Sequence, residues 1–481
     1  MFSISTILVG LAGYFALFFG IGWFLRNWGT TKQKYLLADR RAGLVECTLL
    51  VAGCWTAGLT MIVPPQQAYL NGWVSWTWFT YPQLLGMLIF SWFSTVIYEK
   101  IRSGYTISSY INERYGNQVS ILYQLVFCFS GLGLILTTFT AVLKFLAFIH
   151  ADRPALITAI IVVCTVVYSW KGGIKTSLVT GSIQTVLTAV LLIALCVWGI
   201  GDQGWASFSR SLTGINHVSN FFDWNLLTTF ALTSALTLIT GPLMSPSHHQ
   251  KSFALDNENS WKAWTRGGWF YCILIQLPVG ILGTLALGYG AKSADSSVVH
   301  WVYLQQALGV GALAMMAVVI LNTACTILDS HGNAAATIVA HDWTRNEQHS
   351  TLVSRITLAV LGLIAWVVST YNFDITYIFF TYSTVRVNLF IITMLSVATD
   401  RLNKQGILYS NIVLIPVTLA MGLHGLWYKA PEWNLYAAII AMFGTPCVAY
   451  LVSQVTRASA AGVDRRFLRN VRQGGGVGGL G

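Results

Sequence analysis

Long apolar stretches follow one another along most of the chain, and this pattern restricts the possible folds more than any other feature. A helix needs about 20 mostly apolar residues to cross the hydrocarbon core of a bilayer. Thirteen stretches are candidate spans: 4–25, 45–69, 72–98, 118–149, 155–170, 178–201, 225–247, 266–291, 309–340, 353–371, 375–399, 405–427 and 432–454. We therefore expect an all-α polytopic membrane protein with about 13 transmembrane helices, surrounded by a lipid bilayer.

Charged residues are too scarce for a chain of this length to fold as a globule in water. They make up 9% of the 481 residues, whereas a soluble domain carries about 25%. This shortage excludes a secreted protein, a nucleic-acid-binding protein and a cytosolic enzyme. We expect an integral, multi-pass protein of the cell (plasma) membrane, with no nucleic-acid partner behind its net charge of +11.

The positions of Lys and Arg predict how the chain is oriented. If the N-terminus lies outside, 22 of the 28 basic residues fall in cytoplasmic loops or in the tail, and four fall in outer loops. Cytoplasmic loops are enriched in Lys and Arg in membrane proteins. The charges therefore predict an outer N-terminus and an inner C-terminus. Lys144, near the outer end of its span, is expected to extend its amine to the interface.

Two of the spans, 45–69 and 225–247, are interrupted by glycines and prolines. These residues are Gly53, Gly58, Pro64, Pro65, Gly241, Pro242 and Pro246. A proline removes a backbone donor and clashes with the preceding turn, and the freed groups must be satisfied by protein or by a water-lined cavity. The two spans lie five apart and cross in opposite directions, which is typical of a five-plus-five inverted repeat with two broken helices. Two ordinary proline kinks remain the alternative.

This interpretation divides the chain into six parts. Residues 1–44 are an extra N-terminal transmembrane helix and a cytoplasmic loop, and 45–201 are the first five-helix repeat. An extracellular loop, 202–224, precedes the second five-helix repeat, 225–400. Two C-terminal transmembrane helices, 401–456, and a cytoplasmic tail, 457–481, complete the chain.

Hydroxyl side chains line one face of the span 309–340. Thr323, Thr326 and Ser330 are spaced so that they share a helical face. Hydroxyl and carbonyl oxygens suit a hard cation such as sodium. The alternative is that these hydroxyls bond to the carbonyls of their own helix, which is at least as common.

Two opposite charges are predicted at similar depth in the membrane. Asp329 lies in the span 309–340 and Arg386 in the middle of the span 375–399. An isolated charge is costly there, so the two side chains are expected to form a structural pair. If Arg386 is unpaired, it would instead contact an anionic substrate.

Six motifs in order resemble the sodium:solute symporter family, from about Lys34 to Asp342. They are YLLADRRAG, GCWTAGLT followed by AYLNG, IRSGYTISSYINERYG, WKGGIKTSLVTGSIQ, GPLMSPSHHQKSFALDN and TILDS followed by HD. The resemblance implies a leucine-transporter-like inverted repeat. It also implies a secondary active transporter, usually a sodium-coupled symporter, that moves a small organic solute by alternating access.

The resemblance also implies a sodium (Na⁺) site. Its ligands would be the carbonyls of Gly53, Thr56 and Thr323 and the hydroxyl of Thr326. The sequence departs from the family pattern at Ile327, where a second hydroxyl is usual, and at Gly181, where an aspartate is usual. Sodium coupling is therefore the first expectation. Proton coupling through Asp329 and uncoupled transport remain alternatives.

The resemblance places the substrate between the broken helices. Trp55 and Thr60 would face the central cavity, and Trp78 would form an aromatic outer gate. A tryptophan at the position of Trp55 resembles the choline-transporter branch of the family and favours a cationic substrate. An unpaired Arg386 would favour an anionic substrate. A transporter-like membrane sensor remains an alternative, an enzyme is not expected, and the oligomeric state, monomer or otherwise, stays open.

Overall fold

The structure is a computed structural model that describes residues 4–27, 31–101, 104–170, 172–255, 257–344 and 350–460. All regular secondary structure in these ranges is helical. Residues 461–481, most of the predicted cytoplasmic tail, lie outside the described residues, as do the predicted loop cations Arg102, Lys171 and Arg345. The expected all-α class is confirmed for the described chain.

Helices of different lengths correspond to the predicted spans or to parts of them. They are α1 (Ile4–Phe24), α3 (Leu44–Trp55), α4 (Gly58–Lys100), α6 (Asn117–Phe148), α7 (Pro154–Ser169), α8 (Gly173–Gln203), α11 (Leu232–Ile239), α13 (Asn257–Tyr271), α14 (Leu277–Tyr289), α16 (Val310–Thr337), α17 (Ser350–Ser369), α18 (Ile375–Ala398), α19 (Lys404–Tyr428), α20 (Pro431–Ile439) and α21 (Thr445–Ala460). Nine helical segments of the described chain are long and apolar enough to cross a membrane, and the bent pair α3–α4 brings the number to ten. Two further apolar helices, α7 and Trp224–Ile239, are shorter. The expected count of 13 stays a prediction.

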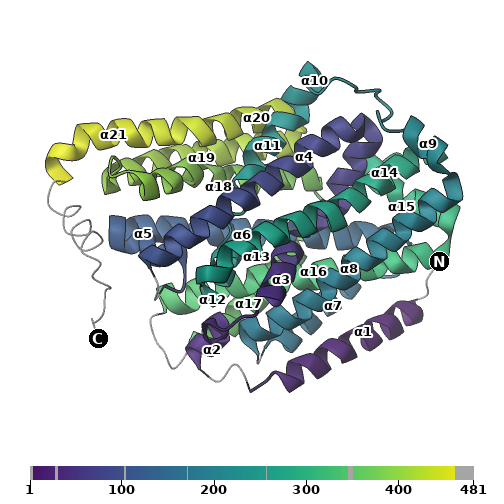
Figure 1. Cartoon of the computed structure of the whole chain (residues 1–481), viewed down its shortest axis with the longest axis horizontal. Helices are drawn as coiled ribbons and strands as arrows, with labels where there is room; N and C mark the ends of the chain where they lie inside the picture. The colour runs from purple at the N-terminus through teal and green to yellow at the C-terminus, as the bar shows by residue number, and fades with distance from the viewer. Residues whose placement is uncertain are drawn as a thin grey trace.

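Helix α16 occupies the interior of the bundle. It packs against α3, α6, α7, α8 and α17. The long helices run roughly along the longest axis of the molecule, with α1 on one side and α19 and α21 on the other (Figure 1). Helix α1 begins at one end of this axis and α21 ends at the opposite end. Helix α16 can therefore bring together residues from both halves of the chain.

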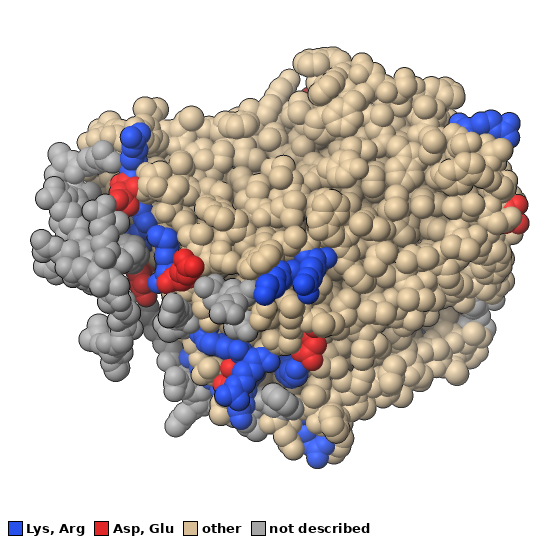
Figure 2. Space-filling view, in the orientation of Figure 1, with Lys and Arg blue, Asp and Glu red and all other residues tan. Residues whose placement is uncertain are grey.

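The surface has the polarity that a membrane imposes. On the face drawn in Figure 2, most Lys, Arg, Asp and Glu side chains lie on the left and in the lower middle, and the upper and right-hand parts are almost free of charge except at the right edge. Large apolar side chains such as Val163, Val190 and Leu363 are more than half exposed. An apolar exterior is favourable only against lipid. Which end faces the cytoplasm stays a prediction from the charges.

The first predicted break is present, but the prolines do not make it. Helix α3 ends at Trp55, Thr56 and Ala57 leave the helical conformation, and α4 sets out at 62° to α3. Pro64 and Pro65 lie farther on, inside α4. Close packing explains the start of α4, because a Cβ at Gly58 would lie 2.6 Å from the backbone of α6.

The second predicted break is also present. Helix α11 ends at Ile239, a turn covers residues 240–245, and α12 (Pro246–Ala254) follows. Pro246 opens α12 at the first helical position, where its missing N–H costs nothing. The two interrupted helices predicted from glycine and proline are therefore confirmed. The inverted repeat itself and the six-part division remain predictions.

Several connecting segments contain short helices that the sequence pattern did not predict. They are α2 (Lys32–Leu37), α5 (Ile107–Tyr115), α9 (Trp205–Arg210), α10 (Trp224–Leu226) and α15 (Val299–Tyr303). Helix α15 buries Trp301 and Tyr303 completely. These helices are too short to show a clear apolar period, and their burial depends on neighbours that are remote in sequence.

Gly72 separates the two legs of α4 and should not tolerate a side chain. Its φ of 67° and ψ of −164° fall in a region open almost only to glycine, where other residues lose about 1–3 kcal/mol. A Cβ there would also lie 2.4 Å from the carbonyl oxygen of Leu212. We expect Gly72→Ala to lower the melting temperature (Tm) of the purified protein clearly.

Gly13→Ala is the matched control for this substitution. Gly13 is exposed on α1, and a Cβ there would meet nothing within 4 Å. Alanine is the better helix former, so this Tm should stay the same or rise. Equal effects of the two substitutions in a thermal melt would contradict the turn at Gly72.

Candidate functional site

Histidine side chains bond to the carbonyls that the two breaks set free. The His331 ring on α16 donates from Nε2 to the carbonyl of Cys54, at 2.9 Å. In the second break, His248 Nδ1 donates to the Pro242 carbonyl at 3.1 Å and His249 Nε2 to the Leu243 carbonyl at 2.8 Å. Histidine side chains therefore satisfy one carbonyl at the first break and two at the second.

A small cavity lies where α3 ends against α8 and α16. Its volume is about 10 Å³, which is close to the least that a single water molecule needs. Its lining consists of glycine and neutral polar residues: Gly53, Thr56, Gln184, Thr185, Thr188, Asn322, Thr323 and Thr326. All four residues predicted to bind sodium therefore meet in one place.

The threonine hydroxyls in this cavity differ in their hydrogen bonds. Thr56 and Thr323 bond to the carbonyls of Ala52 and Val319, one turn back in their own helices, at 2.8 Å each. Thr326 instead donates to Gln184 Oε1 on α8 at 2.7 Å. Back-bonding, the alternative raised from the sequence, is therefore correct for Thr323 and wrong for Thr326.

Sequence reasoning missed several polar partners at this cavity. Gln184 Nε2 donates to the Tyr14 hydroxyl at 2.9 Å, and that hydroxyl donates to Asn322 Oδ1 at 2.8 Å. Asn322 in turn donates to Thr188 Oγ1 at 3.2 Å. Gln184 and Thr188 are spaced to share a face of α8, which was an available signal. Nothing in the sequence pointed to Tyr14, because it belongs to the extra helix α1.

Trp55 and Thr60 lie together on either side of the first break. The Trp55 indole donates to Gln83 Oε1 at 2.5 Å, and Tyr271 donates to the same oxygen at 2.8 Å. The Thr60 hydroxyl lies 3.1 Å from the Tyr271 hydroxyl. Trp55 and Thr60 are only 5% and 2% exposed, so this polar cluster is closed to both sides. Gln83 and Tyr271 were not predicted.

Arg386 reaches this cluster from α18. Its guanidinium carbon lies 5.9 Å from the centre of the Trp55 ring and 5.6 Å from that of Tyr382. One terminal nitrogen donates to the carbonyl of Thr237 at 3.2 Å. The residue is 2% exposed, so the structure brings together three of the four predicted substrate residues.

The predicted pair between Asp329 and Arg386 is wrong. Asp329 accepts hydrogen bonds from Ser169 at 2.8 Å and Asn333 at 2.6 Å. No carboxylate among the described residues forms an ion pair with Arg386. Similar depth did not bring the two charges together, because Asp329 contacts α7 whereas Arg386 contacts α11.

Trp78, the predicted outer gate, lies apart from this cluster. Its indole donates to the carbonyl of Phe221 at 3.0 Å and stacks on the Phe221 ring at 4.7 Å. Trp78 therefore packs against the loop 202–224, and its indole N–H bonds to that loop and not to the Trp55 and Arg386 cluster.

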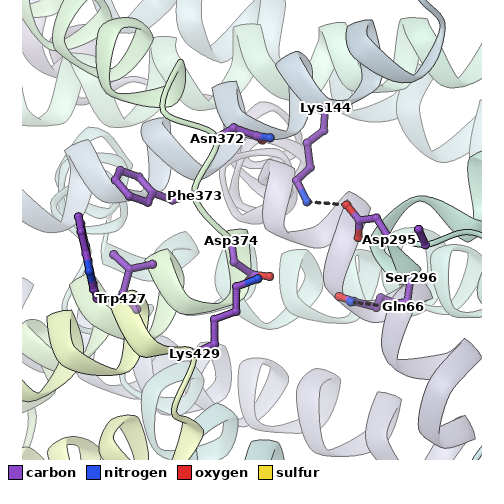
Figure 3. A pocket seen from close by; sticks show the side chains of 11 residues that line it. Gln66, Lys144, Asp295, Ser296, Asn372, Phe373, Asp374, Trp427 and Lys429 are labelled. Carbon is purple, nitrogen blue, oxygen red and sulfur yellow. Dashed lines mark hydrogen bonds and ion pairs between the residues drawn. The ribbon is translucent and has the colours of Figure 1, made fainter.

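A second, wider hollow of about 650 Å³ lies between the ends of several helices. Figure 3 shows the Lys144 amine directed at Asp295 and the Gln66 amide directed at Ser296. The Lys144–Asp295 distance is 3.1 Å and the Gln66–Ser296 distance is 2.8 Å. Lys144 therefore forms an ion pair with a half-exposed residue of the segment before α15, and its extension to the membrane interface stays a prediction.

The chain is similar in sequence or in fold to known proteins. The sequence model of the sodium:solute symporter family matches residues 35–413. A Na⁺-coupled sialic acid symporter in a substrate-bound outward-open state is similar in structure, with a TM-score of 0.79, 15% identity and coverage of 95% of this chain and 98% of that one. Mhp1, a nucleobase-cation-symport-1 family transporter in a closed conformation, has a TM-score of 0.50, 13% identity and coverage of 90% and 97%. No curated protein matches the sequence.

The ion pair at the wide hollow predicts an acid-sensitive contribution to stability. Burial raises the pKa of Asp295, but hydrogen bonds from Ser297 and the charge of Lys144 outweigh it and hold the pKa below its usual range. A lowered pKa in the folded state contributes stability above the unfolded pKa, and this is lost as pH falls through the folded value. Because the Asp295 side chain is 51% exposed, the contribution is at most about 1 kcal/mol.

We expect Asp295→Asn to lower Tm slightly at neutral pH. At acid pH the Tm of this variant should equal that of the unaltered protein. Asparagine can still accept the Ser297 N–H bond that caps the next turn, so the substitution isolates the charge. Lys144→Gln should have the same effect, and the double variant should lose little more. A Tm difference that stays constant across the pH series would contradict the ion pair.

Proposed function

The chain belongs to the sodium:solute symporter family, and on this premise we propose that it is a sodium-coupled symporter of a small organic solute. It is an integral, multi-pass membrane protein that acts as a secondary transporter and not as an enzyme. We assign it to the plasma membrane with its N-terminus outside and its C-terminus inside. Transport proceeds by alternating access around the two broken helices.

The small cavity at the end of α3 carries this proposal. It is lined by the backbone of Gly53 and Thr56 and by the hydroxyl-bearing residues Thr323 and Thr326, and hard cations prefer oxygen ligands. A Cβ at Gly53 would lie 2.1 Å from Thr185 Oγ1, so only glycine leaves this space open. The lining contains no carboxylate among the described residues. This favours weak binding of a singly charged ion over binding of a divalent one.

The position of this cavity supports coupling between ion and solute. Gly53 and Thr56 line the cavity. Trp55, which lies between them in sequence, bonds to Gln83 in the polar cluster that Arg386 reaches. An ion that ties the end of α3 to α16 therefore also fixes the orientation of Trp55. A ligand shifts a conformational equilibrium only by its difference in affinity between the states, and this shared segment supplies such a difference.

The sodium site should depend on the Thr326 hydroxyl and not on that of Thr323. Thr323→Val is the matched control, because its hydroxyl already bonds to Val319 and only its carbonyl would bind the ion. Sodium titrated against N-methylglucamine at fixed ionic strength should raise Tm, since a ligand at about ten times its dissociation constant stabilises by about 1.4 kcal/mol. We expect Thr326→Val to abolish this rise and Thr323→Val to keep it.

Loss of the sodium response in both variants, or in neither, would contradict this ligand assignment. A response to every alkali cation alike would show a general salt effect. Gly53→Ala should also abolish the response, because its methyl group would fill the cavity.

Proton coupling remains the second candidate because of Asp329. This carboxylate lies about one turn from Thr326 on α16 and is 1% exposed, with two hydrogen-bond donors in Ser169 and Asn333. Under sodium coupling, Asp329→Asn should preserve the sodium-dependent Tm shift, and uptake in liposomes should follow the sodium gradient. Uptake driven by a pH gradient alone, and lost in Asp329→Asn, would establish the proton candidate instead.

A further inference from the structure

Arg386 is a buried cation that forms no ion pair with a carboxylate in the described part of the chain. Its Nε has no hydrogen-bond partner in the described part of the chain, and the guanidinium donates only to the Thr237 carbonyl among the hydrogen bonds shown. A guanidinium has five N–H donors. Burial of a charge without a partner is costly and is rarely retained for stability alone.

Three other buried ionisable side chains, Lys251, Asp329 and His331, have hydrogen-bond partners of their own. Lys251, at 2% exposure, bonds to the Ser247 carbonyl at 3.3 Å and lies within electrostatic range of Asp329. Asp329 itself accepts hydrogen bonds from Ser169 and Asn333 and forms no ion pair with Arg386. His331, which interacts electrostatically with Arg386, donates its ring proton to the Cys54 carbonyl. The surroundings of Arg386 therefore carry an excess of one positive charge.

The position of Arg386 suits contact with a ligand better than a role in helix packing alone. It lies beside Trp55, at the end of the first broken helix, and a Cβ at Gly241, in the second break, would lie 3.2 Å from its terminal nitrogen. Ser234, one turn before Thr237 on α11, also has a buried hydroxyl without a partner. Arg386 therefore lies between the end of the first broken helix and the second break, with its Nε unpartnered in the described part of the chain.

We propose that the transported solute carries a carboxylate or a similar planar anionic group, and that Arg386 binds it between the two broken helices. This inference rests on the proposed symport and deepens it by naming the substrate class. A planar guanidinium suits a two-oxygen anion, to which it can donate two parallel hydrogen bonds. The Trp55 and Tyr382 rings lie 5.9 and 5.6 Å from the guanidinium carbon, and Nε has no partner in the described part of the chain.

The same geometry excludes a quaternary ammonium substrate such as choline. The Trp55 ring that would bind such a cation already lies 5.9 Å from the Arg386 guanidinium. A second cation would be repelled at this distance in a site closed to water. The cationic substrate suggested by Trp55 in the sequence is therefore replaced by an anionic one.

The test compares small carboxylates with neutral partners of the same shape. The probes are acetate, propionate, benzoate and N-acetylneuraminate against acetamide, propionamide, benzamide and the N-acetylneuraminate methyl ester, with choline as the cationic arm. Each is titrated in sodium into the purified full-length protein, and Tm is recorded. We expect at least one acid to raise Tm and its neutral partner and choline to have no effect.

Arg386→Gln identifies the residue responsible. Its affinity for the stabilising acid should fall about ten- to hundredfold, whereas its sodium response should remain. Its Tm without ligand should stay the same or rise, because an unbalanced buried charge has been removed. Arg386→Lys should bind the acid with intermediate affinity, since a single ammonium cannot reproduce the two parallel bonds.

Three results would overturn the proposal. They are stabilisation by the neutral partners or choline equal to that by the acids, an unchanged acid response in Arg386→Gln, and a sodium response with no response to any acid. If the unaltered protein responds to an acid but not to sodium, the anion site stands and the sodium coupling fails. The two proposals can therefore fail separately.

Discussion

The interruption of two helices inside an apolar environment is the constraint on which the rest of the structure depends. Each break frees carbonyl and N–H groups that lipid cannot satisfy. His331 bonds to the carbonyl of Cys54, and His248 and His249 bond to carbonyls of the second break. Thr138 accepts the N–H of Gly58. These side chains come from α6, α12 and α16, so satisfying the breaks also determines how these helices pack.

The breaks place two sites of different chemistry on opposite sides of one short segment. Gly53 and Thr56 face a cavity of neutral oxygen and amide groups, while Trp55 contacts Gln83 and lies beside Arg386. A cation and an anion bound at these sites would be carried together with partial cancellation of charge. Neither site requires a carboxylate ligand, which fits a chain whose interior carboxylate, Asp329, is engaged by Ser169 and Asn333.

The central cluster is closed in this structure, and its closure comes from side chains and not from a shift of backbone alone. Trp55 packs so closely on Gly241 that a Cβ there would lie 2.1 Å from the indole. The wide hollow beside Lys144 and Asp295 (Figure 3) is lined by other residues and includes neither Trp55 nor Arg386.

Hydrophobic runs and their interruptions determined the all-helical membrane class and the two broken helices, because lipid imposes a length and polarity that a sequence must show. The family motifs also selected Gly53, Thr56, Thr323 and Thr326, which share one cavity. The partners of these residues were decided only by tertiary structure. Tyr14 on α1 bonds to Asn322, which lines the cavity, and Arg386 turns to Thr237 and Trp55 rather than to Asp329. Helical periodicity specifies the depth of a side chain and its neighbours on one helix, but the helix that a face meets depends on how the whole bundle packs.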